Sequence, residues 1–456
     1  MKLYLLIRTF LSRHLTPARI FVLSFAAAIL LGTVLLSLPY AFRQTPLRFI
    51  DALFTATSAV CVTGLTVLDI GSDLSLFGQV VTMLLFQIGG LGIITFSIIL
   101  FALMGRGISF KGREVTQSLF MYSPKKDFNL IIKKVLLYTL IIESAGALLL
   151  FFRFAREFSL GQALYHAVYH AVSAFNNCGY SLFSDSLTRY QEDVVVNLII
   201  ALLIILGGIG FLVQQEVVAR LRDRRNKLSL HTKIVLITTG VLIFGGAVLF
   251  YLLEADNVLQ GASLKTALLT SFFQSVTART AGFNTVDIRM LTNSTILIML
   301  MLMFIGASPG SAGGGVKTTS FALLLLLVVN RIRGNENVNV ANRTIPRELV
   351  ERTISIIFSA AVLIGLVTAL LLFFSDSSGM PFALRHEFIE YVFETFSAFG
   401  TVGLSMGATQ KLNDVQKYAI ILMMFIGRVG PLTMAFAWYS SRKRRVTYAE
   451  ESVMVG

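Results

Sequence analysis

Four short apolar segments of the chain carry the same pattern of residues around a glycine. The four glycines are Gly64, Gly179, Gly282 and Gly403. Each has an aromatic residue ten positions before it and a leucine, tyrosine or phenylalanine directly after it. Glycine permits backbone conformations that other residues avoid, and turns of this kind can replace the hydration shell of a monovalent cation with carbonyl oxygens. The chemistry that these segments suggest is therefore coordination of a cation by the backbone.

The candidate ion-binding residues are the glycines and the residues directly before them. They are Cys61, Val62, Thr63, Gly64, Asn176, Asn177, Cys178, Gly179, Thr280, Ala281, Gly282, Thr401, Val402 and Gly403. None of them is charged, so the predicted ligands for a monovalent cation are carbonyl oxygens. A lone glycine would equally indicate close helix packing, which is common in membrane bundles. Four glycines at matched positions favour a selectivity filter.

A second glycine follows each of the first four at a nearly constant distance. Gly89, Gly207, Gly306 and Gly427 lie 25, 28, 24 and 24 residues further along. Because this pair of glycines recurs four times, the sequence predicts four tandem repeats. Each consists of a span, a short re-entrant helix, a turn and a second span. The predicted divisions are residues 1–105 for the N-terminal tail and repeat 1, 106–222 for repeat 2, 223–334 for repeat 3, and 335–456 for repeat 4 and the C-terminal tail.

The composition indicates the environment in which these repeats lie. The chain has 456 residues, of which 55% are hydrophobic and 14% charged, with a mean hydropathy of +0.75. Soluble domains carry about 25% charged residues, so a soluble enzyme, a disordered chain and a nucleic-acid-binding protein are excluded. Eight runs are long enough to cross a bilayer, and they predict an all-α integral membrane protein with a pseudo-fourfold ion pore. The runs are 20–42, 74–105, 135–152, 194–215, 234–253, 290–316, 353–375 and 418–441.

The basic residues predict the orientation. The formal net charge is +14, from 39 Lys+Arg against 25 Asp+Glu. Segments 1–19, 106–134, 219–233, 331–352 and 442–456 together hold 26 of the basic residues and 8 of the acidic ones. The positive-inside rule places these segments and both termini in the cytoplasm, for a multi-pass protein of the cytoplasmic (inner) membrane. Docking of a cytoplasmic partner is a second interpretation of the same charges.

A glycine-rich stretch interrupts the sixth run. It contains Gly306, Gly310, Gly313, Gly314 and Gly315, with Lys317 directly beyond it. Glycine and proline at this density should break the helix in the membrane. The stretch is not a phosphate-binding loop, because a valine separates the last glycine from the lysine and no strand precedes it. From its residues alone the stretch predicts a structural kink, and its interpretation as a gate below the filter comes from the family resemblance given below.

Charged residues inside the runs are functional candidates by default. Arg428 follows Gly427 and would oppose cations if it faced the pore, or else it anchors helix ends through carbonyl groups. Lys317 is a second, weaker gate candidate. Glu143 and Glu394 are expected to form hydrogen bonds inside the bundle, and Arg279 to point behind the filter, with Glu394 as a speculative partner.

Three further groups of residues have alternative interpretations. Asp69 and Asp287 would lie at the outer mouth, where they could concentrate cations or be ordinary loop charges. The spacing of His166 and His170 is helical, but no third zinc ligand is evident. Both cysteines lie in filter segments and are expected to pack as small residues.

Residues 57–65, 173–180, 277–284 and 397–404 resemble the four filter signatures of the membrane subunit of the Trk/Ktr/HKT superfamily of potassium transporters, and the eight-span length is most similar to the Ktr type. A member of this family would use the glycine-rich stretch as an intramembrane loop that gates the pore below the filter. The resemblance implies a homodimer with one pore per chain in the lipid bilayer, a cytoplasmic nucleotide-binding ring as regulator, and no cofactor bound by the chain itself. It also associates glycine in all four turns with potassium, and serine in the first turn with sodium. Sodium stimulation is neither supported nor opposed by these residues.

Two other classes of protein are alternatives. A coupled, sodium-dependent symporter with alternating access would need ion-binding carboxylates in broken helices, often in inverted repeats. The four repeats run in one direction, and only Glu143 and Glu394 are candidates. An intramembrane enzyme would need a catalytic constellation, and none recurs in the predicted spans.

Overall fold

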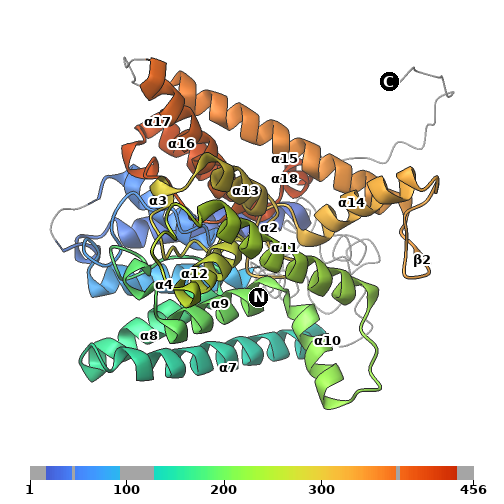
Figure 1. Cartoon of the computed structure of the whole chain (residues 1–456). Coiled ribbons are helices and arrows are strands. Elements are labelled where there is room, and N and C mark those ends of the chain that lie inside the picture. The colour runs from blue at the N-terminus through green and yellow to red at the C-terminus, as the bar shows by residue number, and fades with distance from the viewer. Residues whose placement is uncertain (1–16, 44–46, 93–127, 376–380, 439–456) are drawn as a thin grey trace, which may run out of the picture.

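The computed structural model describes residues 17–43, 47–92, 128–375 and 381–438, which form four successive units around a common centre (Figure 1). Each unit has a first helix, a pore helix and a second helix. These are α2 (Pro17–Leu36), α3 (Phe49–Val60) and α4 (Leu76–Gly90) in repeat 1; α7 (Phe128–Phe154), α8 (Leu160–Phe175) and α9 (Val194–Gly208) in repeat 2; α11 (Leu230–Glu254), α12 (Leu264–Thr277) and α13 (Asn293–Phe304) in repeat 3; and α15 (Arg347–Phe373), α16 (Pro381–Gly400) and α17 (Asp414–Val429) in repeat 4.

Shorter elements connect or extend these helices. Helices α10 (Phe211–Arg222), α14 (Thr318–Ile332) and α18 (Pro431–Trp438) follow the second helices of repeats 2, 3 and 4. Single 3-10 turns are η1 (Pro39–Ala41), η2 (Thr188–Tyr190), η3 (Ile288–Met290) and η4 (Thr409–Lys411). An antiparallel hairpin of β1 (Asn339–Val340) and β2 (Arg343–Thr344) lies between α14 and α15. We call the face at which the pore helices begin the outer face, following the predicted topology.

All four second helices begin with a side-chain cap. Ser75, Asp193, Thr292 and Asn413 each accept a hydrogen bond from a backbone N–H in the first turn of α4, α9, α13 and α17. Such caps satisfy amide groups that have no partner inside the helix, and each contributes about 1 kcal/mol. The polar residue before each apolar run therefore fixes where the second helix starts.

The repeats pack in a closed cyclic order. The second helix of each repeat contacts the pore helix of the next: α4 with α8, α9 with α12, α13 with α16, and α17 with α3. The last of these contacts joins the two ends of the described chain. Four units that each contact the next, with the fourth contacting the first, surround an axis, as the repeat pattern predicts.

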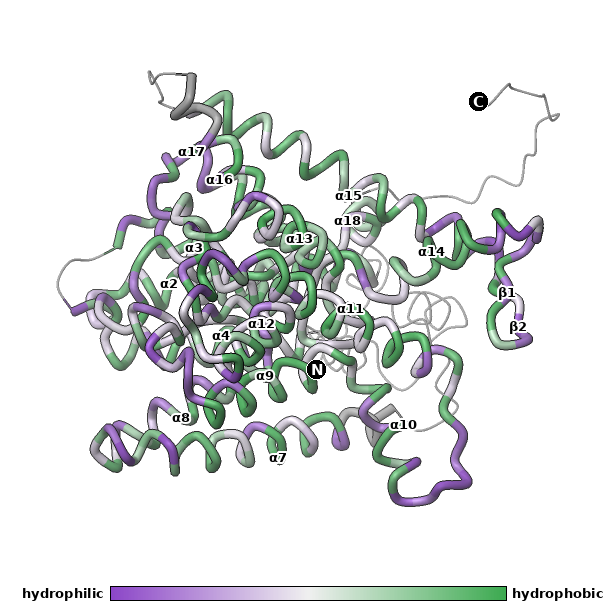
Figure 2. The backbone as a smooth tube through the Cα atoms, in the orientation of Figure 1, coloured by the Kyte–Doolittle hydropathy of each residue, from purple (hydrophilic) through white to green (hydrophobic). Residues whose placement is uncertain are grey.

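Apolar side chains cover the outside of this ring. Hydrophobic residues run along α7 and α15, whereas hydrophilic residues gather after α10 and at the β1–β2 hairpin (Figure 2). By length and composition, three of the described helices can each cross a membrane: residues 133–154 of α7, α11 and α15. The bent pairs α9–α10 and α17–α18 raise this number to five. The second half of the predicted run 74–105 lies outside the described residues.

Three of the predicted spans are not continuous helices. Run 194–215 bends by 105° between α9 and α10, and run 418–441 bends by 94° between α17 and α18. Gly210 and Gly430 occupy these breaks with φ of +93° and +91°, a conformation that favours glycine. Run 290–316 ends as a helix at Phe304. The break in run 290–316 was predicted from its glycine and proline residues, whereas the bends at Gly210 and Gly430 were not predicted.

An ion pair joins the first and last repeats. The Nζ atom of Lys417, on α17, lies 2.7 Å from a carboxylate oxygen of Asp51, on α3, and the two side chains are only 8% and 14% exposed. We expect Lys417→Met to lower the free energy of unfolding by roughly 3 kcal/mol, because the mutation leaves a largely buried carboxylate with less compensation. Thermal unfolding in detergent measures this effect.

The matched control is Arg347→Met. Arg347 pairs with Glu351, but these side chains are 92% and 64% exposed, and exposed pairs contribute about 1 kcal/mol or less. Equal losses of stability in the two variants would show that the Asp51–Lys417 pair has no special role in closing the ring.

Candidate ion-conduction pathway

The four predicted turns share one backbone conformation. The residues two positions before the glycines, Val62, Asn177, Thr280 and Thr401, have φ of +57°, +57°, +72° and +50°. The glycines themselves have φ of +91°, +79°, +81° and +92°, and the residue between each pair is not left-handed. Positive and negative φ therefore alternate over three successive residues in each turn. The geometry is thus suited to coordination by backbone oxygens.

The turns contact one another in the cyclic order of the repeats. A Cβ atom added to Gly64 would lie 2.1 Å from the carbonyl oxygen of Cys178, in the next turn. The corresponding distances are 2.4 Å from Gly179 to the oxygen of Ala281, 2.5 Å from Gly282 to that of Val402, and 2.2 Å from Gly403 to that of Thr63. Real Cβ atoms do not approach oxygen so closely, so a side chain at any of the four positions must displace a carbonyl group of its neighbour.

Hydroxyl groups on the pore helices hold the turns. Ser58 and Ser397 each accept a hydrogen bond of 3.0 Å from the backbone N–H of the glycine six residues later. Ser173 instead donates to the carbonyl of Tyr180. In the third repeat, Thr277 donates to the carbonyl of Phe283, one position later in the pattern. Three copies of the repeat thus have a serine six residues before the glycine, the third has a threonine five residues before it, and each of these hydroxyl groups holds its turn.

The second set of glycines allows close packing between the second helix and the pore helix. A Cβ atom at Gly89, Gly207 or Gly427 would lie within 2.1 Å of a carbonyl oxygen at the end of the pore helix in the same repeat. At Gly306 the nearest atom is instead the carbonyl oxygen of Gly314, at 2.2 Å. The third repeat therefore differs, because the glycine-rich stretch occupies the position that the pore helix takes in the others.

That stretch, residues 305–317, is a loop beneath the turns, and we call it the intramembrane loop. The Gly314 N–H donates to the hydroxyl of Thr401, at 2.9 Å. A Cβ atom at Gly313 would lie 2.2 Å from the hydroxyl of Thr280. Both threonines belong to the predicted filter, so the loop contacts the inner ends of the third and fourth turns.

Further hydrogen bonds attach the intramembrane loop to other repeats. Ser308 N–H and Ala312 N–H donate to the carbonyls of Gly208 and Gly207, and Phe211 N–H donates to the carbonyl of Gly310. Gly315 N–H donates to the carbonyl of Gly427, at 3.2 Å. The loop is therefore held by repeats 2 and 4.

Arg428 is anchored through carbonyl groups, as the alternative for this residue predicts. Its guanidinium donates to the carbonyl of Ala312 in the intramembrane loop and to that of Gly89 at the end of α4. It thus joins the loop to repeats 1 and 4, which fits the gate interpretation as well. Lys317 donates hydrogen bonds to the carbonyls of Gly313 and Gly314 within the same loop.

The buried acidic residues form hydrogen bonds inside the bundle, as expected. Glu143 accepts hydrogen bonds from Gln87 and Asn176, and Glu394 accepts them from Ser405 and Thr409. The suggested pairing of Glu394 with Arg279 is wrong, because no ion pair among the described residues joins them. These hydrogen bonds from neutral donors offset part of the cost of burying each carboxyl group.

The remaining predicted residues lie in ordinary structural environments. Cys61 and Cys178 are buried and free. The ring of His170 is hydrogen-bonded to the His166 carbonyl and to the Ser181 hydroxyl. At the outer mouth, Arg289 donates hydrogen bonds to Asp287 and lowers the pKa of that carboxyl below its ordinary value. Asp69 accepts hydrogen bonds from the Gly71 and Ser72 N–H groups, so neither carboxylate lacks protein donors.

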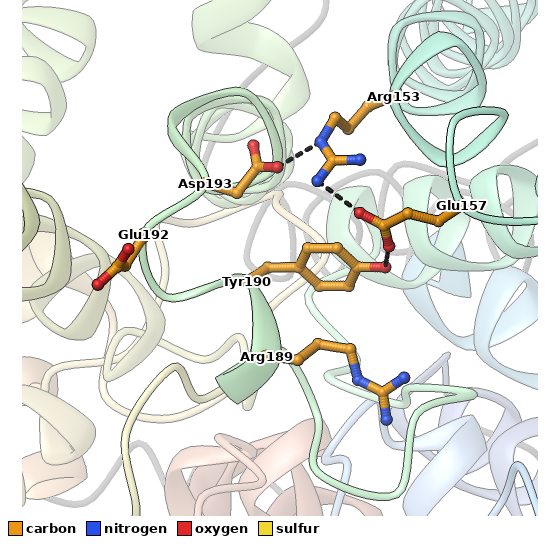
Figure 3. A pocket seen from close by; sticks show the side chains of 6 residues that line it. All are labelled: Arg153, Glu157, Arg189, Tyr190, Glu192 and Asp193. Atoms are coloured by element: carbon orange, nitrogen blue, oxygen red, sulfur yellow. Dashed lines mark hydrogen bonds and ion pairs between the residues drawn. The ribbon is translucent and has the colours of Figure 1, made fainter.

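A charged pocket of about 350 Å³ lies on the outer face and is lined only by repeat 2 (Figure 3). Arg153 points between Glu157 and Asp193 and forms an ion pair with each, and the hydroxyl of Tyr190 donates to Glu157 at 2.8 Å. None of its residues belongs to a filter turn. The ion pairs of Arg153 therefore stabilise the junction of α7 and α9. The pocket is separate from the candidate ion pathway.

A ring of four helix-supported turns in an apolar helical chain, with a loop across its inner side, defines a membrane transport protein of the pore-loop class. Residues 18–442 match the sequence profile of the TrkH family, described as a cation transport protein. The chain belongs to this family.

Individual relatives support the same assignment. The Ktr system potassium uptake protein B of Bacillus subtilis is 38% identical over 446 residues, which cover 97% of both chains. The potassium/sodium uptake protein NtpJ of Enterococcus hirae is 35% identical and covers 97% of this chain and 98% of its own. The crystal structure of the potassium transporter TrkH from Vibrio parahaemolyticus superposes with a TM-score of 0.70 at 20% identity, over 92% of this chain and 86% of that one. This last likeness supports the fold.

Proposed function

We propose that this chain takes up potassium across the cytoplasmic membrane through the ring formed by the four glycine turns. The observation that carries the proposal is the cyclic contact of each filter glycine with a carbonyl oxygen of the next turn. The names of the Ktr relatives support potassium as the transported ion. The candidate filter consists of the residues predicted from the sequence, from Cys61–Gly64 in the first turn to Thr401–Gly403 in the fourth.

The intramembrane loop, with Gly306, Gly310, Gly313, Gly314, Gly315 and Lys317, together with Arg428, is proposed as the gate. Its hydrogen bonds to the inner ends of two turns support this role. Orientation with both termini in the cytoplasm rests on the basic segments, and a homodimer and a nucleotide-binding regulatory ring rest on the resemblance to the Ktr type.

Sodium-coupled symport is the second candidate, and the name of the NtpJ relative favours it. A symporter would use carboxylates to bind the coupling ion. Glu143 and Glu394 are both engaged with neutral donors of the protein. This engagement supports a structural role for them and a passive pore for the chain.

Flux into liposomes that contain only the purified chain tests the proposal. We expect saturable potassium flux down an imposed gradient that exceeds sodium flux measured in the same way. Potassium accumulation against its gradient, driven by a sodium gradient, would establish the symporter instead. No flux of either ion, even with Arg428→Ala protein in which the gate is weakened, would contradict the pore.

A further inference from the structure

Three polar side chains form a closed ring of hydrogen bonds behind the second turn. The amide of Asn176 donates to Oε1 of Gln87 at 2.6 Å and to a carboxylate oxygen of Glu143 at 3.1 Å. The amide of Gln87 donates to the other carboxylate oxygen of Glu143, at 3.3 Å. Glu143 is only 8% exposed and Asn176 is fully buried, so water hardly competes for these bonds. We call the three residues the amide–carboxylate cluster.

The cluster joins three helices from two repeats. Asn176 is the residue at which the pore helix α8 ends, Glu143 lies on α7, and Gln87 lies on α4 of repeat 1. Two residues beyond Gln87, a Cβ atom added to Gly89 would lie 2.0 Å from the carbonyl oxygen of Val60, at the end of the first pore helix. The end of α4 is therefore packed against the start of the first turn, and the cluster attaches the second turn to that same end.

Asn176 lies directly before the left-handed part of the second turn. The next residue, Asn177, has a φ of +57°, a conformation that a residue with a side chain keeps only where its surroundings hold it. The carbonyl oxygen of Cys178 follows and lies against Gly64 of the first turn, 2.1 Å from an added Cβ atom. The matching position of the other three turns is occupied by Cys61, Arg279 and Gly400. The second turn therefore begins with an amide side chain that the other repeats lack at this position.

A filter of backbone carbonyl groups selects an ion by the number and arrangement of its oxygens, and the side chains behind such a site maintain that arrangement. We propose that Glu143 is a positioning residue for ion selection, which acts through Asn176 on the second turn. Its carboxylate holds the amide of Asn176, and this contact fixes the Cys178 carbonyl relative to the first turn. The effect on ion selection rests on the proposed function, whereas the effect on the geometry of the turn does not.

Amide hydrogen exchange of the purified full-length protein tests the positioning without transport. The Cys178 N–H donates to the Ser173 carbonyl at 2.9 Å, and the Val402 N–H forms the matching bond to Ser397 in the fourth turn. We expect Glu143→Ala to speed exchange at Cys178 by about tenfold, as for loss of one hydrogen bond to a charged group, and to leave Val402 unchanged. Unchanged exchange at Cys178 in folded Glu143→Ala protein would overturn the proposal.

Competitive flux of potassium and sodium into liposomes tests the consequence for selection. Glu143→Ala should lower the ratio of potassium to sodium flux by about tenfold, and Glu143→Gln, which keeps the size and one acceptor oxygen, by about threefold or less. The matched control is Glu254→Ala. Glu254 is fully buried at the end of α11 and accepts hydrogen bonds from Asn257 and Thr292, which lie outside the four turns. Its loss should lower stability and keep the ratio, and an equal fall of the ratio in this control would overturn the proposal.

A second variant displaces the amide and leaves the carboxylate in place, so that the test survives if Glu143→Ala fails to fold. A Cβ atom added to Gly90 would lie 2.0 Å from Oδ1 of Asn176 and 2.7 Å from its Cγ. Gly90→Ala must therefore move this side chain and should also lower the flux ratio. Gly240→Ala on α11 is its control, because a Cβ atom there meets no atom within 4 Å. A folded Gly90→Ala protein with the ratio of the unmodified chain would contradict the proposal.

The two measurements separate the positioning role from the proposed pore. Exchange at Cys178 depends on the geometry of the turn, whereas the flux ratio also requires that ions pass through the ring. Absence of flux in the unmodified chain, together with faster exchange in Glu143→Ala, would count against the pore and leave the positioning role of Glu143 established.

Discussion

Serine in place of Gly64 is expected to lower the ratio of potassium to sodium flux by about tenfold or more, which corresponds to about 1.4 kcal/mol of lost discrimination. A Cβ atom at this position would lie 2.1 Å from the carbonyl oxygen of Cys178. The oxygen must move by more than 1 Å to reach an ordinary contact distance of about 3.5 Å, and it then no longer lies where the ring holds it. The φ of +91° adds backbone strain of about 1–2 kcal/mol for any residue with a side chain. Competitive flux of the two ions into liposomes measures the ratio.

The control Gly261→Ser separates the effect of the displaced carbonyl oxygen from the effect of backbone strain. Gly261 has a φ of +76°, but a Cβ atom there would meet no other atom within 4 Å. This control therefore carries the backbone strain without the displaced carbonyl, and its flux ratio should equal that of the unmodified chain. A Gly64→Ser protein that is folded and keeps the same ratio would show that the turns pack closely without selecting the ion.

The four turns could be predicted because their requirements are local and repeated. Each turn needs a glycine at one position. Each copy of the repeat also has an aromatic residue ten positions before that glycine and a leucine, tyrosine or phenylalanine directly after it. The serine six residues before the glycine was visible in three copies, although its hydrogen bond to the turn emerged only from the structure. The third copy has Val276 at this position, and the hydroxyl that holds its turn belongs to Thr277, one position later.

Interactions between repeats could not be predicted in this way. The ion pair of Asp51 and Lys417 joins residues that are 366 positions apart, and only the closing of the ring brings them together. Arg279 and Glu394 seemed natural partners by charge, but Glu394 lies against Ser405 and Thr409. The bends at Gly210 and Gly430 could not be predicted either, because the hydropathy of a run does not show whether its helix is straight or bent.

The third repeat departs from fourfold symmetry at the point where the sequence departs from the repeat pattern. In three repeats the second helix packs its glycine against the end of the pore helix, whereas Gly306 packs against Gly314. Insertion of the intramembrane loop at a single position makes the inner side of the ring asymmetric. If its hydrogen bonds to the other repeats break, the intramembrane loop alone can control the candidate ion pathway that all four repeats form.

Replacement of Arg428 by alanine is expected to raise potassium flux by at least about tenfold. The guanidinium donates hydrogen bonds to Ala312 in the loop and to Gly89 in repeat 1. Displacement of the loop breaks the hydrogen bond to Ala312, and hydrogen bonds from charged groups contribute about 1.5–3 kcal/mol each. Loss of this bond therefore favours the displaced loop by roughly 2 kcal/mol, or about 30-fold in the equilibrium. Flux rises less than the equilibrium shifts once the loop is displaced for most of the time. Initial rates of potassium uptake into liposomes, at matched amounts of folded protein, give the ratio.

Lys317→Met tests whether potassium flux is controlled by the attachment of the loop to Arg428 or by positive charge near the pathway. Among the residues that the structure describes, Lys317 donates hydrogen bonds to Gly313 and Gly314 inside the loop, so its replacement removes a charge without breaking a hydrogen bond between the loop and another repeat. If the attachment controls the gate, Lys317→Met should leave the flux nearly unchanged, and deletion of residues 307–314 should raise it as Arg428→Ala does. Equal increases in the two substituted proteins would indicate an electrostatic barrier instead. A decrease in flux for folded Arg428→Ala protein, together with a decrease after the deletion, would mean that the loop supports the filter and does not obstruct it.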